Sequence, residues 1–356
     1  MQKTITFSTI GLGNRGGDRV SIELANHLAD DGHTINYLFP SGMNKTTFFI
    51  NPKVNLIEYG PRIKQIEDFS SIIRSFFLFY AIPKSDLILA NYYLTVFPIL
   101  IHHIIHSNSK IFYLIQAYEP YSFGKSEKTF PKIKQWLAER TYTFGFKHIC
   151  VANWIKEKVD KFAKSPSFLF SPGINHSSFN QNKLSNNLRP EASVLIFPSK
   201  EEAKGWNDFL NAISFVLEEF PDVEIIASSK GEFPINHPNI KSIQPKNDDE
   251  LAELYRSSTI YVHPAWWEGC PLAPLEAMAC GTPVVAARSE GILEYAVHLE
   301  NCYLVNVNDP GDLAKGIITL LKDKELREKV SMNGLKTAKN YTWEKMYDQL
   351  KNIILK

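Results

Sequence analysis

The sequence predicts an α/β protein with two Rossmann-like domains, each built on an open, doubly wound parallel sheet. Its length of 356 residues exceeds the usual size of one domain. Short runs rich in Ile, Val, Phe and Tyr alternate with segments of helical period, in two successive series. A polar segment rich in Asn and Ser, residues 175–192, separates the two series and is the best candidate for a linker.

The first series predicts a domain over residues 1–180. Its expected strands are Ile5–Ile10, Thr34–Phe39, Val54–Tyr59, Asp86–Ala90, Ile111–Gln116 and His148–Ala152. Between the first two strands, Val20, Leu24 and Leu28 recur at helical spacing, and Asp18 is placed to cap that helix. Strands that alternate with helices favour parallel pairing through right-handed crossovers. We therefore expect one parallel sheet in this domain.

The second series predicts another such domain over residues 193–340. Its expected strands are Val194–Phe197, Val223–Ala227, Ile260–His263, Pro283–Ala287 and Cys302–Val305. After the first of them, Phe209, Ile213 and Val216 fall on one face of a helix. The chain closes with helical segments near Pro310–Lys322, Lys324–Asn340 and Thr342–Leu355. We treat residues 341–356 as a separate C-terminal helix.

Composition excludes several classes of protein. Hydrophobic residues make up 44% and charged residues 22% of the chain, which is typical of a globular protein and not of a disordered or fibrous one. The four cysteines are scattered and form no CxxC pair, so neither a disulfide framework nor a zinc site is expected. The apolar runs are too short and interrupted to span a membrane. A cytoplasmic protein fits these features best.

Charge is unevenly distributed along the chain. Residues 1–180 hold 20 Lys or Arg against 13 Asp or Glu, a net charge of +7, and the remainder holds 19 against 25, a net charge of −6. A basic first half predicts an anionic partner such as membrane headgroups or a phosphorylated acceptor, although uneven charge without a partner is equally open. Nucleic acid is not expected, because no recognised binding fold accompanies the charge.

One basic stretch, residues 125–140, interleaves lysines with apolar residues. It carries Lys125, Lys128, Lys132 and Lys134 around Phe130, Ile133 and Trp136. Such a helix can lie on an anionic membrane surface, which predicts peripheral association with the inner face of the plasma membrane. The alternative is an ordinary amphipathic helix packed on its own domain.

Two glutamates, Glu268 and Glu276, stand on either side of a Gly- and Pro-containing turn that leads into a short helix. The start of a helix offers free N–H groups and a positive dipole end, which suit nucleotide phosphates. A carboxylate near the first turn can bind the vicinal hydroxyls of a ribose. Taken alone, such glutamates are more often solvated or capping residues.

The surrounding segment resembles a known signature. Residues 266–287 read WWEGCPLAPLEAMACGTPVVAA, which is similar to the pattern E-G-F-G-L-x-x-x-E-A-M-A-x-G-x-P-V-V of the family-4 retaining glycosyltransferases. Cys270 replaces an aromatic residue, and Pro271 replaces a Gly and so removes one backbone N–H. The resemblance implies the GT-B architecture, in which two Rossmann-like domains face a central cleft and the last helix packs back on the N-terminal domain.

The resemblance also implies a set of donor-binding residues. Lys204, followed by a Gly, resembles the lysine that contacts the donor diphosphate, while Ser199 stands where relatives have an Arg and Lys200 either replaces that Arg or leaves the clamp incomplete. Glu268 and Lys204 are the catalytic candidates, at the donor sugar and at the leaving diphosphate. The nucleotide contacts implied are Glu276, Lys204, Lys200, Ser199, Gly269, Cys270 and Leu272.

In the first domain, the resemblance implies contacts with the acceptor. The turn formed by Asn14, Arg15, Gly16 and Gly17 resembles the glycine-rich loop that approaches the donor diphosphate and the acceptor. Residues 116–120, QAYEP, resemble a Q-D-Y-E-P run of enzymes active on surface polysaccharides. Gln116, Glu119 and Asn91 are therefore candidates for binding acceptor hydroxyls, although a polar loop that only caps a strand is equally open.

The reaction implied is the transfer of a hexose or deoxyhexose from a nucleotide-diphosphate sugar to a hydroxyl of a cell-surface glycan or glycolipid precursor, with retention of configuration. No metal or other cofactor is expected; His102, His103 and His106 lack an HExxH pattern and an evident further ligand. The partners expected are the nucleotide sugar and a glycan or lipid-linked acceptor. Alternatives are a sugar-nucleotide epimerase, a phosphorylase, or a catalytically silent scaffold of a glycan assembly complex.

Overall fold

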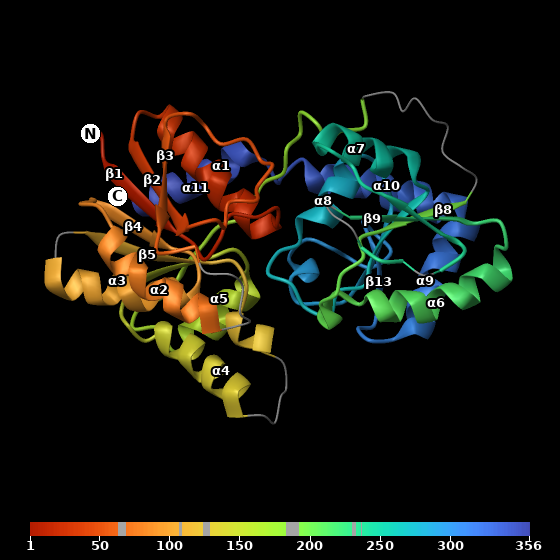
Figure 1. Ribbon diagram of the computed structural model, residues 1–356. Helices are drawn as coiled ribbons and strands as arrows, with labels where there is room; N and C mark the ends of the chain where they lie inside the picture. Colours follow the sequence, from red (N-terminus) through yellow and green to blue (C-terminus); the bar gives the residue numbers. More distant parts are fainter. Residues whose placement is uncertain (63–68, 107–108, 124–128, 183–191, 230–232, 236) are drawn as a thin grey trace. The chain divides into compact units, whose positions relative to one another are not determined.

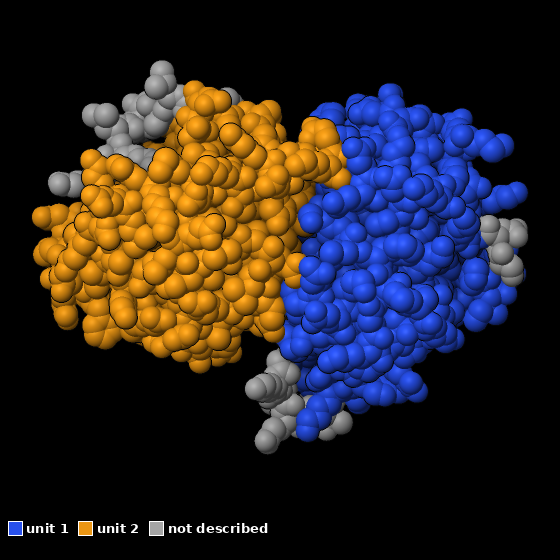
Figure 2. Space-filling view, turned by 180° about the vertical axis from the view of Figure 1, so that it is seen from behind, with its two compact units in different colours: residues 1–171, 346–356 blue, residues 172–345 orange. Residues whose placement is uncertain are grey.

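The computed structural model describes residues 1–62, 69–106, 109–123, 129–182, 192–229, 233–235 and 237–356. The chain forms two compact units (Figure 2). Unit 1 comprises residues 1–171 and 346–356, and unit 2 comprises residues 172–345. Each contains one parallel sheet covered by helices (Figure 1). None of the helices in the described ranges is both long enough and apolar enough to cross a membrane.

The sheet of unit 1 has the strand order β3-β2-β1-β4-β5-β6-β7. Its strands are β1 (Thr4–Ser8), β2 (Thr34–Pro40), β3 (Val54–Tyr59), β4 (Leu87–Ala90), β5 (Lys110–Ile115), β6 (Lys147–Cys150) and β7 (Phe168–Leu169). Every pairing is parallel, with Ile5 aligned to Ile35 on one side and to Leu87 on the other. The expected strands are confirmed with small shifts at their ends. The short strand β7 was not predicted, because two half-exposed residues give no periodic signal.

Helices cover both faces of this sheet (Figure 1). They are α1 (Gly16–Asp30), α2 (Phe69–Ala81), α3 (Tyr93–His106), α4 (Thr129–Thr141), α5 (Asn153–Asp160), the 3-10 turn η1 (Glu119–Phe123) and the end of α11 (Trp343–Ile354). Helix α1 begins before Asp18, whose carboxylate accepts hydrogen bonds from the backbone N and the Nε of Arg15, both at 3.2 Å. Asp18 therefore caps the helix from inside its first turn.

Helix α11 returns to unit 1 and is held against α1. The hydroxyl of Tyr347 donates to Asp31 Oδ2 at 2.6 Å, and Lys351 Nζ donates to the same oxygen. These two hydrogen bonds lower the pKa of Asp31. The ring of His27 stacks on Tyr347 with centroids 5.0 Å apart. The last turns of the chain thus join the face of the unit 1 sheet that carries α1.

The sheet of unit 2 has the order β10-β9-β8-β11-β12-β13, with every pairing parallel. Its strands are β8 (Ser193–Ile196), β9 (Glu224–Ser228), β10 (Ile240–Ile243), β11 (Ile260–His263), β12 (Val284–Ala287) and β13 (Tyr303–Val305). Its helices are α6 (Trp206–Glu219), α7 (Asp248–Ser257), α8 (Leu272–Ala279), α9 (Pro310–Lys322) and α10 (Lys324–Ala338), with 3-10 turns η2 (Glu202–Lys204) and η3 (Ile292–Glu294). Of these strands, β10, a partly exposed edge strand, was not predicted.

The polar segment that we expected to be a linker is partly folded into unit 2. Phe179 is fully buried, and its ring packs against that of Tyr255 with centroids 6.1 Å apart. Arg256 donates from Nη1 to the carbonyls of Ser178 and Asn180, at 3.3 and 3.2 Å. Phe179 and Arg256 thus hold residues 178–180 against unit 2. Residues 183–191 lie outside the described ranges.

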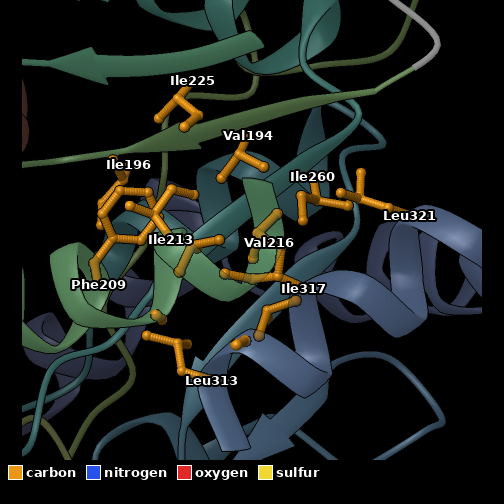
Figure 3. Close-up of a cluster of buried hydrophobic side chains, with 14 of the residues drawn as sticks. Val194, Ile196, Phe209, Ile213, Val216, Ile225, Ile260, Leu313, Ile317 and Leu321 are labelled. Carbon is orange, nitrogen blue, oxygen red and sulfur yellow. The ribbon is translucent and has the colours of Figure 1, made fainter. Parts of the chain in front are cut away.

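The core of unit 2 lies between its sheet and the helices α6 and α9 (Figure 3). Phe209 and Ile213 from α6 and Ile317 from α9 are completely buried there. They close over Val194 and Ile260 of the neighbouring central strands β8 and β11. The core therefore fixes the two strands whose carboxyl ends carry the candidate site.

We expect Phe209→Ala to lower the free energy of unfolding by about 3–5 kcal/mol, because a buried ring is replaced by a cavity. Phe215 lies on the same helix and is 50% exposed, so Phe215→Ala is the matched control, with an expected loss of about 0.5 kcal/mol. Urea denaturation followed by circular dichroism measures both. Equal losses would mean that Phe209 is not part of a packed core.

Candidate active site

Three side chains meet where strands β8 and β11 end. Lys204 lies in η2, beyond β8; His263 is the last residue of β11, and Glu268 follows it on the next loop. Lys204 Nζ donates to Glu268 Oε1 at 2.8 Å, although the two residues are 64 positions apart. His263 Nε2 lies 3.5 Å from the same oxygen. The parallel topology brings these groups together, because neighbouring strands end at one edge of the sheet.

The charges of this cluster are set by burial and by the ion pair. Burial acts to raise the pKa of Glu268, but the positive charge of Lys204, together with the hydrogen bond from Lys204, opposes burial, and the pKa is lowered. Burial lowers the pKa of His263 despite the nearby charge of Glu268. At neutral pH the site therefore holds an ionised carboxylate, an ammonium group and a neutral imidazole.

Sequence reasoning did not select His263. Its Nδ1 lies 3.3 Å from the hydroxyl of Tyr261, and its side chain is only 10% exposed. The available signal was its position: a histidine at the end of a predicted strand, five residues before Glu268. Its contact with Glu268 depends on the path of the intervening loop, which no local pattern describes.

The loop that carries Lys204 is joined to the loop that carries Glu268. The backbone N of Trp266 donates to the carbonyl of Ala203 at 2.7 Å, and its indole Nε1 donates to Asp208 Oδ2 at 2.5 Å. Gly205 has a φ of 71°, and a Cβ there would lie 2.2 Å from the carbonyl oxygen of Pro264. A glycine is therefore required for this close approach.

The loop after β12 supports Glu268 from another side. A Cβ on Gly291 would lie 2.3 Å from the carbonyl oxygen of Glu268 and 2.6 Å from that of Gly269. The hydroxyl of Tyr295 donates to the carbonyl of Pro271 at 2.7 Å. The backbone from Glu268 to Pro271 is thus packed tightly between neighbouring segments.

Glu276 lies within α8 and is only 7% exposed. Helix α8 starts at Leu272, after Pro271, so Glu276 lies in the second turn rather than near the first. The hydroxyl of Tyr255 donates to Glu276 Oε2 at 3.4 Å. Cys270, between Gly269 and the helix, is partly exposed. The carboxylate predicted to bind a ribose is therefore held by a buried tyrosine in the same unit.

The remaining donor candidates lie on the loop between β8 and Lys204. Lys200 is exposed, and Ser199 Oγ accepts a hydrogen bond from the backbone N of Glu201 at 3.1 Å. Ser199 therefore stabilises the turn that leads to Lys204. The hydrogen bond gives Ser199 a definite structural role beside its predicted contact with the nucleotide.

In unit 1, three of the acceptor candidates meet at the carboxyl ends of β1, β4 and β5. Gln116 Nε2 donates to the carbonyl of Gly17 and to Asn91 Oδ1, both at 2.9 Å. A Cβ on Gly17 would lie 3.3 Å from Gln116 Oε1, so the glycine allows this approach. Asn91 and Gln116 directly follow the neighbouring strands β4 and β5, and Gly17 lies in the first turn of α1, so the three residues form one polar cluster at this edge of the sheet.

The other predicted residues of unit 1 make contacts that organise its loops. Asn14 Oδ1 accepts from the backbone N of Thr47 at 2.8 Å. Arg15, paired with Asp18, is 70% exposed, and Gly16 is the first residue of α1. The glycine-rich turn thus opens α1, as predicted, while Asn14 fastens the neighbouring loop to it.

Glu119 is buried inside unit 1 rather than exposed at its edge. Its Oε2 accepts hydrogen bonds from the hydroxyl of Tyr113 at 2.6 Å and from the backbone N of Tyr93 at 3.0 Å. Burial raises the pKa of Glu119 to about 8, although both hydrogen bonds oppose the shift. These contacts give Glu119 a structural role in joining β5, α3 and η1.

Two histidines of α3, His102 and His106, lie close together. The rings of His102 and His106 lie 4.5 Å apart. Within the described part of the chain, no three His, Cys, Asp or Glu side chains group as metal ligands.

Comparisons with known proteins agree with this architecture. Residues 235–337 match the family model "Glycosyl transferases group 1". An uncharacterized glycosyltransferase of Haemophilus influenzae is 24% identical over 372 residues, which cover 99% of this chain and 100% of that protein. Several further relatives are matched over 56% of their own length or less.

Solved structures share the fold over the whole chain. Sucrose-phosphate synthase from Thermosynechococcus elongatus has a TM-score of 0.81 at 17% identity, covering 99% of this chain and 98% of that one. HepE of Anabaena, in complex with UDP-glucose, has a TM-score of 0.75 at 15% identity, covering 99% and 100%. These likenesses establish the GT-B fold, and with the family match they support a glycosyltransferase of the GT-B type.

We expect Gly205→Ala to disrupt the candidate site, because the new methyl group collides with the Pro264 carbonyl. Gly281 is the matched control: its φ is 72°, but a Cβ there meets only ordinary contacts at 3.8 Å. The left-handed conformation costs both variants about 1–2 kcal/mol, and Gly205→Ala should lose about 3 kcal/mol or more. Urea denaturation measures the difference. Equal losses would show that the loop can accommodate the methyl group.

Proposed function

We propose that unit 2 binds a nucleotide-diphosphate sugar and that the protein transfers its hexose or deoxyhexose to a hydroxyl of a cell-surface glycan or glycolipid precursor. The anomeric configuration is retained in this proposal. The observation that carries it is the Lys204–Glu268 ion pair at the carboxyl ends of β8 and β11. The UDP-glucose held by HepE, which has the same fold, supports a nucleotide sugar as donor.

In this proposal Glu276 binds the ribose hydroxyls of the donor. It is a buried carboxylate in the helix that follows the Glu268 loop, and Tyr255 holds one of its oxygens. A carboxylate has about four lone-pair sites, so it can accept hydrogen bonds from more than one donor at a time. Burial strengthens such hydrogen bonds because water does not compete for the acceptor.

Lys204 is proposed to stabilise the leaving diphosphate. An ammonium group has three N–H donors, so Lys204 can stay bonded to Glu268 while it donates to a phosphate oxygen. Negative charge on the diphosphate grows as the bond to the sugar breaks, and a fixed positive charge at that point stabilises the transition state more than the bound donor. Lys204 supplies this charge without a resident metal ion, which is the basis for proposing that none is required.

The proposed chemical step forms the new bond on the face from which the diphosphate departs. The bond between the anomeric carbon and the diphosphate oxygen breaks, and a bond from that carbon to the acceptor oxygen forms. The acceptor proton passes to the departing phosphate oxygen, so no protein base is needed. Glu268, kept ionised by Lys204, lies beside the sugar and favours the positive charge that develops on its ring.

The acceptor is proposed to contact unit 1. The cluster of Gln116, Asn91 and Gly17 offers amide and carbonyl groups at the carboxyl ends of three strands. Arg15, exposed at the start of α1, adds a positive charge for a phosphorylated acceptor or the donor diphosphate. A cytoplasmic location, where nucleotide sugars serve as donors, completes the proposal.

We expect Glu276→Ala to weaken binding of the cognate nucleoside diphosphate about 10- to 100-fold, because the ribose loses a charged acceptor. Isothermal titration calorimetry with UDP, GDP, dTDP and ADP first identifies the cognate base and then measures the variant. Glu325→Ala, which removes an exposed glutamate on α10, is the control and should bind normally. Unchanged affinity in folded Glu276→Ala protein would remove Glu276 from the site.

We expect Lys204→Ala to lower kcat about 10²- to 10³-fold and to change KM for the donor much less, because its charge acts mainly in the transition state. Lys324→Ala removes an exposed lysine of α10 and is the control, with kcat expected to be unchanged. Steady-state kinetics of donor hydrolysis or sugar transfer separates the two constants. A variant that kept kcat and lost only donor affinity would make Lys204 a binding residue alone.

A further inference from the structure

Helices α2 and α3 of unit 1 expose a group of large apolar side chains. We define the α2–α3 patch as Phe76, Tyr80, Ile101, Ile104 and Ile105, which are 65%, 84%, 46%, 68% and 58% exposed. Single exposed apolar residues are common on soluble proteins, but a group of them on adjacent helices marks an interaction surface. No role in donor or acceptor binding uses these residues.

The patch is continuous across the two helices. Within each helix its members lie one turn apart, so they share a face. Between the helices, the ring centroid of Phe79 lies 6.1 Å from that of His102 and 6.5 Å from that of His106. The two helices therefore pack side by side (Figure 1). The patch residues of both helices are exposed beside this contact.

A pocket that owes its basic character to Lys84 lies beside the patch, at the C-terminal ends of α2 and α3. It has a volume of about 430 Å³, and its lining includes Lys84, His102, His103 and His106 but no Asp or Glu among the described residues. Over residues 69–115, Asp86 is the only acidic residue in the sequence. Asp86 is exposed near the pocket but does not line it, so the surface is apolar with few negative charges to repel an anionic partner.

Helix α4, which the sequence singled out for membrane contact, contributes less charge than expected. Lys134 is 8% exposed and lies over the ring of Phe123 at 5.9 Å, so it is part of the packing of unit 1. Lys125 and Lys128 fall outside the described residues. Trp136 is 55% exposed and Lys132 is exposed, so one of the two predicted lysines that the structure describes on this helix is buried and the other is accessible.

We propose that the α2–α3 patch docks unit 1 on the surface of an anionic phospholipid bilayer. The apolar side chains enter the boundary between headgroups and acyl chains, and the basic pocket holds a lipid phosphate. The net charge of +7 over residues 1–180 complements that surface. A second copy of the chain is a poorer occupant, because two basic pockets would then face each other.

This proposal goes beyond sugar transfer, and its test needs neither donor nor acceptor. The full-length protein is mixed with sedimenting vesicles of phosphatidylcholine, with or without phosphatidylglycerol, at low and high salt. We expect binding to the phosphatidylglycerol vesicles that falls as salt rises. Tyr80→Ser combined with Ile104→Ser should weaken that binding about tenfold or more, and Lys84→Gln about fivefold.

Matched controls come from unit 2. Phe215→Ser and Met332→Ser each remove an exposed apolar residue, 50% and 58% exposed, and should bind vesicles as the unchanged protein does. Nucleotide affinity, measured by calorimetry, should be equal in all variants, which shows that they are folded and separates this proposal from the proposed function.

Three results would overturn the proposal. The first is no binding to phosphatidylglycerol vesicles at low salt, and the second is an equal loss in the patch and control variants. The third is seen by light scattering if the unchanged protein has the mass of a dimer and the Tyr80→Ser, Ile104→Ser protein has the mass of a monomer, while both bind vesicles equally. That outcome would make the patch an interface between two copies of the chain.

Discussion

The arrangement of the candidate site depends on the ion pair between Lys204 and Glu268. A carboxylate whose side chain is 18% exposed keeps its charge only beside a positive group, since burial alone favours its neutral form. The pair therefore requires the loops after β8 and β11 to hold a fixed distance, and the core beneath them provides it. Removing one partner would leave the other charge partly buried without compensation.

Close backbone packing maintains that distance. Gly205 and Gly291 lie where any Cβ would meet a carbonyl oxygen at little more than 2 Å, and Trp266 joins the two loops by backbone and indole hydrogen bonds. A site built in this way is ordered before substrate arrives, so little binding energy is spent on arranging it. The neutral His263 fits the same scheme, because it packs beside Glu268 without adding a charge.

In unit 1, some polar residues are buried and support the fold, while others lie at the edge of the sheet. Glu119 is withdrawn into the interior by Tyr113 and Tyr93, whereas Gln116 and Asn91 remain at the carboxyl edge of the sheet. Its outer helices present apolar side chains to solvent, which is costly unless another surface covers them. The proposed acceptor contacts and the proposed docking surface therefore lie on different parts of unit 1.

The sequence by itself determined the two α/β halves, most strands and helices, and the Glu268–Glu276 segment, because these depend on local periodicity and on contiguous motifs. Tertiary structure alone decided which groups meet: His263 with Glu268, Gln116 with Gly17, and the burial of Glu119 and Lys134. The edge strands β7 and β10 and the folded start of the polar segment were not predicted, because they too depend on tertiary contacts. Such contacts arise between residues far apart in the chain, and hydrophobic pattern carries no information about the loops that bring them together.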